Sequence, residues 1–313
     1  MTSTHYGVIG LGPVGTLLSA VLGAAGQQVS TVSLEPEKAA VLRNSPIKVH
    51  GAINLEGRVS RAFLTLEELL DATPDVILLT TKCCDSPALL DRIKALQPEP
   101  RWVIVSCQNG IDVEAQIVER FGDARALRMV LNVGCRLLSP VEVEVVFNLP
   151  SILSDRAAVP AAVRQRVASH LDGAGFPVRV EESYQTEVFK KAILNSSMGA
   201  GGARPGRTKQ GGRGDPSRRH GLEGRVDEDI AIAQRLGLGI GPGFVDEAMA
   251  YMGRGGHHRP SMLEDLERGR KTENDAHCGR LVYYAERLGV PAPMNQAMYA
   301  LVRNRELGGG AKA

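Results

Sequence analysis

The stretch Tyr6-Gly-Val-Ile-Gly10-Leu-Gly12-Pro-Val-Gly15 decides the fold of this 313-residue chain. Its apolar start predicts a short strand, and the apolar residues after the glycines, Val14–Leu22, predict a helix. The first glycine of this spacing allows a tight turn, the second lets the backbone approach a pyrophosphate, and the third lets helix and strand pack closely. The N–H groups and the dipole at the start of a helix favour an anion. We therefore predict a dinucleotide-binding turn that comprises Gly10, Leu11, Gly12, Pro13, Val14 and Gly15.

Strands and helices continue to alternate over the first 180 or so residues. The run Asp75–Thr81 is largely apolar and follows a proline, which is typical of a parallel strand buried on both faces. Ser86 is expected to cap the next helix, with Pro87 in its first turn. This alternation predicts an α/β fold with a doubly wound parallel sheet. The expected strands are 6–10, 28–34, 75–81, 102–106 and 177–180, and the expected helices are 14–22, 37–43, 86–95, 111–121 and 160–174.

Runs with the pattern of a strand end near Glu182, and the rest of the chain is expected to be helical. The expected helices are 186–198, 221–236, 244–252, 262–269 and 272–288. We therefore expect two domains, a dinucleotide-binding domain over residues 1–182 and an all-helical C-terminal domain over residues 183–313.

The composition is that of a globular protein, with 43% hydrophobic and 23% charged residues. No run of 18 or more apolar residues is present, so no membrane-spanning helix and no membrane partner are expected. The first residues lack the charged and then apolar pattern of a signal peptide, which favours a cytoplasmic location. The five cysteines are odd in number and scattered, so we expect neither a disulfide framework nor a metal site.

Glu35 bears on the choice of cofactor. It lies 20 residues after Gly15, close to the spacing of the acidic residue that accepts the 2′-hydroxyl of an adenosine ribose. A carboxylate at that position repels a 2′-phosphate, so Glu35 favours NAD over NADP. An ordinary solvated turn residue is the alternative interpretation of Glu35, and both cofactors stay open.

The second half of the chain contains three further motifs. Lys191-Ala-Ile-Leu-Asn195 puts a lysine and an asparagine on one helix face. It is followed by Arg259-Pro-Ser-Met-Leu-Glu-Asp-Leu-Glu-Arg-Gly-Arg-Lys-Thr-Glu-Asn-Asp275 and by Gly289-Val-Pro-Ala-Pro-Met-Asn295. Together with the glycine turn, Thr81-Lys82 and Cys107-Gln-Asn109-Gly110, these motifs closely resemble the ketopantoate reductase (2-dehydropantoate 2-reductase) family across both domains.

The resemblance implies an oxidoreductase with a Rossmann domain, a helical domain and an active site in the cleft between them. Such an enzyme passes a hydride from NADPH or NADH to the keto group of a 2-keto acid, which is ketopantoate in pantothenate biosynthesis. Lys191 would be the general acid that protonates the carbonyl oxygen, and Glu273 would hold and tune that lysine. The substrate would be bound by Asn109, Asn195 and Ser261, and the residues beside the cofactor would include Lys82, Asn109 and Glu273. A homodimer is expected on the resemblance alone.

Elementary chemistry supports a lysine in this role. Hydride attack places negative charge on the carbonyl oxygen, and a cation that can also give a proton stabilises and then quenches that charge. Two adjacent lysines usually form a solvated face, but Lys191, and not Lys190, has the four-residue spacing to Asn195. Ser261 has a second interpretation, since Glu264 follows it at the spacing of a helix capping box.

Gly199 departs from the family pattern, which usually has another asparagine at this position. The loss of an amide leaves a substrate oxygen without one partner, so the substrate stays open. A D-2-hydroxyacid dehydrogenase that uses NAD is one alternative, since such enzymes share this fold family. A cofactor-binding homologue with weak catalysis is the other.

Residues 200–221 also depart from the family, because they are rich in glycine and arginine and have almost no large apolar side chain. Such a segment cannot bury a face. Three interpretations stay open: a functional basic loop near the active site, a segment that binds an anionic partner, or an altered reading frame in the source DNA. The segment has no aromatic residues for stacking on bases, so no nucleic acid is expected as a partner.

Overall fold

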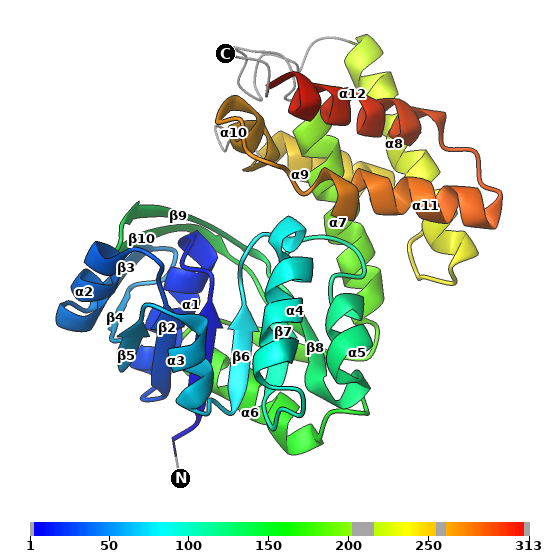
Figure 1. Ribbon diagram of the computed structural model, residues 1–313. Helices are drawn as coiled ribbons and strands as arrows, with labels where there is room; N and C mark the ends of the chain where they lie inside the picture. The colour runs from blue at the N-terminus through cyan, green and yellow to red at the C-terminus, as the bar shows by residue number, and fades with distance from the viewer. Residues whose placement is uncertain (1–2, 202–215, 255–260, 310–313) are drawn as a thin grey trace. The chain divides into compact units, whose positions relative to one another are not determined.

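The computed structural model describes residues 3–201, 216–254 and 261–309, and the chain divides into two compact units (Figure 1). The first comprises Met1–Gln108 and Asp112–Tyr184, and the second comprises Asn109–Ile111 and Gln185–Ala313. The chain therefore passes from one unit to the other after Gln108, after Ile111 and after Tyr184.

The first unit is built around an eight-stranded sheet in the order β12-β11-β8-β7-β6-β1-β2-β5. Its strands are β1 (His5–Ile9), β2 (Gln28–Val32), β5 (Arg61–Phe63), β6 (Val76–Leu79), β7 (Val103–Ser106), β8 (Ala126–Val130), β11 (Ser151–Ser154) and β12 (Val178–Glu181). Neighbouring strands are parallel except β8 and β11, which pair antiparallel. The expected parallel-sheet fold is confirmed, but β5, β8 and β11 were not predicted, and β8 pairs antiparallel with β11.

Helices cover both faces of this sheet (Figure 1). Val76 and Leu78 of β6 join one apolar core with α1 and α6, whereas Ile77 and Leu79 join the other core with α3, α4 and α5. This two-sided burial explains the continuous apolar sequence of β6 and confirms the doubly wound architecture. The helices of this unit are α1 (Pro13–Ala24), α2 (Pro36–Asn44), α3 (Leu66–Asp71), α4 (Ser86–Leu96), α5 (Ala115–Phe121) and α6 (Ala161–Asp172), with short 3₁₀ turns η1 (Cys83–Asp85) and η2 (Asp123–Arg125).

A second sheet of four strands, in the order β4-β3-β10-β9, packs against α1. Its strands are β3 (Ile47–Gly51), β4 (Leu55–Gly57), β9 (Val133–Ser139) and β10 (Glu142–Asn148). The sequence pattern predicts no strand in these segments. Only alternate residues such as Val143 and Val145 enter the apolar core, so the segments lack the continuous apolar runs that mark the main sheet.

The described regular elements of the second unit are all helices. Its elements are α7 (Tyr184–Gly201), α8 (Pro216–Arg235), α9 (Phe244–Arg254), α10 (Ser261–Glu267), η4 (Asn274–Ala276), α11 (Cys278–Leu288) and α12 (Pro293–Gly309). α7 begins at the last residue of the first unit. The sequence analysis did not predict α12. Within the described part of the chain, no helix has the length and apolar character that crossing a membrane requires.

Two expected helices begin later than predicted. Helix 111–121 begins at Ala115, because Asp112 has a φ of +57° and cannot continue a right-handed helix. Helix 272–288 begins at Cys278, because Asn274–Ala276 form a 3₁₀ turn and His277, with a φ of −106° and a ψ of −91°, is not helical.

The segment 200–221 falls largely on residues 202–215, which lie outside the described residues. Its three interpretations therefore stay predictions. Gly199 lies within α7.

Candidate active site

The glycine turn of the first unit leaves open space for a ligand at the start of α1. Gly10 has a φ of +106°, and a Cβ there would lie 2.5 Å from the Thr81 nitrogen. A Cβ at Gly15 would lie 1.9 Å from the Gly10 carbonyl oxygen, whereas a Cβ at Gly12 would meet no atom within 4 Å. The helix begins at Pro13 without a side-chain cap. The turn thus fits a pyrophosphate, because both the space and the N–H groups at the helix start remain available.

The ends of the neighbouring strands meet at this turn. The Thr80 hydroxyl donates to the carbonyl oxygens of Ile9 (3.0 Å) and Gly10 (2.5 Å), which fixes the chain just before Lys82. Gln108 Nε2 donates to the Thr81 carbonyl at 2.9 Å and to the Ser86 hydroxyl at 2.7 Å. Lys82 therefore follows the end of β6 beside the glycine turn.

The prediction that Ser86 caps the next helix is wrong. Ser86 is the first residue of α4, and the N-cap position belongs to Asp85, which makes no side-chain capping bond. The Ser86 hydroxyl accepts from Gln108 instead, so a tertiary contact occupies the group that the sequence assigned to the helix start.

The start of α2, which follows β2, carries one acidic and one basic side chain. Glu35 is exposed and occupies the N-cap position of α2, where its backbone N–H donates to the Ser33 hydroxyl at 3.3 Å. Lys38 Nζ donates to the Leu11 carbonyl at 2.8 Å. The glycine turn is thereby tied to α2.

Lys191 and Asn195 lie one turn apart on α7, and both are half-buried. The neighbouring Lys190 forms an ion pair with Glu187 at 2.9 Å on the same helix. The ion pair with Glu187 accounts for Lys190.

The structure brings Asn109 and Glu273 together. Asn109 Nδ2 lies 3.4 Å from Glu273 Oε2, and the Ile111 N–H donates to the Ala276 carbonyl at 2.8 Å. Residues 109–111 therefore lie along the turn that carries Glu273. These two predicted site residues are 164 positions apart in sequence.

Helix α12 holds the residues on both sides of Glu273. The backbone N–H and the hydroxyl of Thr272 both donate to Glu306 Oε1, at 2.9 and 2.6 Å. On the other side, Asn274 Nδ2 donates to the Tyr299 carbonyl at 3.2 Å. Thr272 and Asn274 are buried, so the position of Glu273 is set by the C-terminal helix.

Ser261 is the first residue of α10 and is exposed. The proposed capping box with Glu264 requires Ser261 to precede the helix, so the observed boundary does not give that arrangement. In the same helix, buried Asp265 pairs with Arg270 at 3.0 Å.

A buried polar cluster, which the sequence analysis missed, joins three helices of the second unit. Arg225 of α8 donates to the Ser196 carbonyl of α7 at 2.7 Å and to Asn295 Oδ1 of α12 at 3.1 Å. Asn295 Nδ2 donates to Asp229 Oδ1 at 2.9 Å. Burial raises the pKa of Asp229 to about 7, against the opposing effect of the Arg225 charge. The cluster fixes α7 one residue after Asn195.

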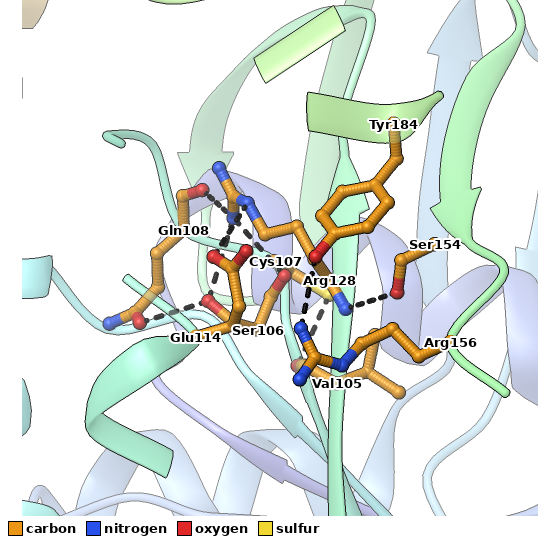
Figure 2. Close-up of polar contacts among 9 residues, drawn as sticks. All are labelled: Val105, Ser106, Cys107, Gln108, Glu114, Arg128, Ser154, Arg156 and Tyr184. Carbon is orange, nitrogen blue, oxygen red and sulfur yellow. Dashed lines mark hydrogen bonds and ion pairs between the residues drawn. The ribbon is translucent and has the colours of Figure 1, made fainter. Parts of the chain in front are cut away.

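A second missed cluster lies in the first unit, around Arg128 (Figure 2). Arg128 is a buried cation in the apolar strand β8, where it bonds to the segment that precedes Asn109. A charged residue within the run Ala126-Leu-Arg-Met-Val130 was a usable signal, because a buried arginine requires partners. Among the described residues, no group of three or more His, Cys, Asp or Glu side chains is arranged to hold a metal ion.

Both halves of the chain match models of one protein family. Residues 6–155 match the model described as "Ketopantoate reductase PanE/ApbA", and residues 183–306 match "Ketopantoate reductase PanE/ApbA C terminal". The chain is also 26% identical to a 2-dehydropantoate 2-reductase of Pyrococcus abyssi, over 97% of this chain and 99% of that protein.

Solved structures share the fold at low identity. A 2-dehydropantoate 2-reductase from Methylococcus capsulatus has a TM-score of 0.84 and 23% identity, over 99% of this chain and 98% of that one. A D-mandelate dehydrogenase with NADH and anilino(oxo)acetate has a TM-score of 0.83 and 18% identity, over 99% of this chain and 100% of that one.

Proposed function

Because the chain belongs to the ketopantoate reductase family, we propose that it transfers a hydride from a nicotinamide cofactor to the keto carbon of a 2-keto acid. The observation that carries the proposal is the contact between Asn109 and Glu273. It joins two residues, distant in sequence, to which the family resemblance assigns one reaction.

The glycine turn would hold the pyrophosphate of the cofactor, because the space beside Gly12 is open and the first N–H groups of α1 lack a side-chain cap. Lys82, at the end of the neighbouring strand, would border the nicotinamide end. A reduced nicotinamide cofactor, when bound, supplies the hydride. The chain supplies the remaining groups of the reaction.

Lys191 would act as the general acid. As the hydride reaches the carbonyl carbon, the electron pair of the C=O bond moves to oxygen, and the Lys191 ammonium gives that oxygen a proton to form the alcohol. Glu273 would orient the ammonium through its carboxylate, and Asn109 and α12 keep this carboxylate in place. The lysine is then neutral and regains its proton from water.

Substrate oxygens would be bound by amide and hydroxyl groups that add no charge. Asn109 and Asn195 would donate to the oxygens of the keto acid, and exposed Ser261 would help to hold its carboxylate. We propose ketopantoate as the substrate by family membership. Gly199 offers no amide, so a 2-keto acid without the ketopantoate hydroxyl is the second candidate, as in a D-2-hydroxyacid dehydrogenase.

We propose NAD over NADP, on the basis of Glu35. Its carboxylate is exposed at the end of β2 and repels a 2′-phosphate. Lys38 lies on the same helix but is bonded to the Leu11 carbonyl, so it is engaged by the turn. A higher kcat/KM with NADPH than with NADH would contradict this preference.

The test is a turnover assay of the full chain with NADH and with NADPH. Ketopantoate, pyruvate and branched 2-keto acids are compared, and loss of reduced nicotinamide is recorded. Oxidation with ketopantoate supports the proposal, and oxidation only with other 2-keto acids supports the dehydrogenase alternative. Cofactor binding without turnover of any 2-keto acid would contradict the proposal that this chain is an enzyme. It would support the alternative of a cofactor-binding homologue.

Three further expectations accompany this function. We propose that the chain takes part in pantothenate biosynthesis, that it acts in the cytoplasm, and that it forms a homodimer. Sedimentation at several protein concentrations tests the dimer, and growth of a pantothenate-requiring host that carries the gene tests the pathway.

A further inference from the structure

Arg128 is the largest of the fully buried side chains described, with 1% of its surface exposed. It lies on β8 between apolar neighbours that are also buried. A guanidinium is costly to remove from water unless it is paired and hydrogen-bonded. The partners of Arg128 therefore indicate what this residue holds in place.

Arg128 binds the segment that leads from β7 to Asn109 (Figure 2). Its Nη1 donates to the Ser106 carbonyl at 3.2 Å and makes a short hydrogen bond to the Gln108 carbonyl. The Nε lies 3.8 Å from Glu114 Oε2, and that carboxylate is also buried. One cation thus contacts both sides of the loop that contains Asn109.

Tyr184 extends this cluster to the start of α7. Burial raises the pKa of the Tyr184 hydroxyl, and the charge and a hydrogen bond of Glu114 raise it further. Arg156 Nη1 donates to the same hydroxyl at 2.9 Å. The buried carboxylate of Glu114 therefore interacts with two groups, the Arg128 guanidinium and the Tyr184 hydroxyl.

These contacts coincide with the places where the chain leaves the first unit. Gln108, Asp112 and Tyr184 are the residues of the first unit at the three crossings. Arg128 bonds to Gln108, Glu114 follows Asp112 by two residues, and Tyr184 is itself a crossing. At the second crossing the backbone lies in the left-handed region, since Asp112 has a φ of +57°, a conformation that an aspartate tolerates better than most residues but that its surroundings must favour.

We infer that Arg128, with Glu114 and Tyr184, is a positioning residue for the proposed reaction: this cluster holds the residues of the first unit from which the chain continues to Asn109 and into α7. This inference rests on the proposed function. Asn109 directly follows the carbonyl that Arg128 binds, and Lys191 lies about two turns along the helix that Tyr184 begins. A small displacement of either group lowers the rate, because near-attack geometry is sensitive to shifts of about 1 Å.

The test uses two variants of different severity. Arg128→Lys keeps the charge but cannot present the two-pronged donor set of a guanidinium, and Tyr184→Phe removes only one hydroxyl. The control is Tyr6→Phe, which removes the hydroxyl of another buried tyrosine of the same unit, one that pairs with His170 at 2.9 Å. Each full-length variant is compared by kcat, by KM for the keto acid, by cofactor Kd and by hydrogen exchange of peptides 106–114 and 184–190.

For Arg128→Lys and Tyr184→Phe we expect kcat to fall about 10- to 100-fold, cofactor Kd to stay unchanged and exchange to quicken in both peptides. Tyr6→Phe should change neither kcat nor exchange in these peptides. Unchanged exchange and kcat in folded Tyr184→Phe would overturn the inference, as would equal losses in Tyr6→Phe. If Arg128→Lys fails to fold, the kcat and hydrogen exchange of Tyr184→Phe decide whether the inference holds. An inactive wild-type protein would count against the proposed function, whereas the exchange comparison would still decide the positioning.

Discussion

The glycine turn of the first unit and the Glu273 turn of the second are held in different ways. At the glycine turn, backbone meets backbone: Gly15 packs on the Gly10 carbonyl, and Gly10 packs on Thr81. At the Glu273 turn, side chains from another helix hold the flanking residues, through Glu306 and the Tyr299 carbonyl. The first arrangement is specified by the absence of side chains, and the second by long-range polar contacts.

The difference separates two kinds of functional position. A backbone site needs a few small residues at fixed local spacing, so its motif carries nearly all the necessary information. A side-chain site needs each reacting group to be oriented by partners, and those partners lie tens or hundreds of positions away. Both units accordingly contain buried ionisable side chains with distant partners, such as Arg128 in the first and Arg225 in the second.

Replacement of the proposed acid gives the largest expected effect. Lys191→Ala should lower kcat by about 100- to 10,000-fold, since general acid catalysis contributes on that order, with little change in cofactor Kd. Lys190→Ala is the matched control, because its partner Glu187 is a solvent-accessible residue on the same helix, and it should keep nearly full kcat. Similar kcat values for both variants would remove Lys191 from the mechanism.

Asp229 gives the helical unit a pH dependence that the glycine turn lacks. Its pKa is about 7 in the folded protein and about 4 when unfolded. Between these values the unfolded chain releases the proton while the folded chain keeps it, so the contribution of Asp229 to stability falls as pH rises from about 4 to about 7.

Asp229→Asn should abolish this decline. The difference in free energy of unfolding between variant and wild type should grow in favour of the variant by up to about 4 kcal/mol over that range. Denaturant unfolding at several pH values measures it, with exposed Asp227→Asn of the same helix as control. A pH-independent difference would show that Asp229 is already ionised in the folded protein.

Substitutions of two glycines test whether close backbone packing holds the glycine turn of the first unit. Gly15→Ala forces a methyl group onto the Gly10 carbonyl, and we expect a loss of about 1–3 kcal/mol in stability together with weaker cofactor binding. Gly12→Ala meets no protein atom, so it should keep the stability and weaken only cofactor binding. Thermal unfolding and cofactor titration separate the two effects. Equal melting temperatures for both variants would contradict the packing argument.

Glu306→Ala gives the smallest expected effect, because it touches the reaction only through Thr272 and Glu273. We expect kcat to fall about 10-fold through loss of positioning, with unchanged cofactor Kd. Exposed Glu286→Ala on α11 is the control. A kcat equal to that of the control would show that Glu273 is positioned without α12.

Much of the first unit was predictable because its signals are local. The glycine turn, the apolar run of β6 and the change to helices near Glu182 each follow from a few adjacent residues. The second sheet was missed, since Val143 and Val145 alternate with half-exposed glutamates and give no continuous run. Ser86 was misassigned because its hydroxyl bonds to Gln108, a contact that no local pattern contains.

By itself the sequence determined the glycine turn, the family resemblance and the identity of Lys191, Asn195 and Glu273 as candidates. Those conclusions depend on residue types at fixed spacing. Only the tertiary structure decided that Asn109 contacts Glu273 and that Glu306 accepts hydrogen bonds from Thr272. The same holds for the hydrogen bond from Arg128 to the segment before Asn109. The physical reason is that a buried polar group requires a partner but does not specify, from its own position in the chain, which residue that partner will be.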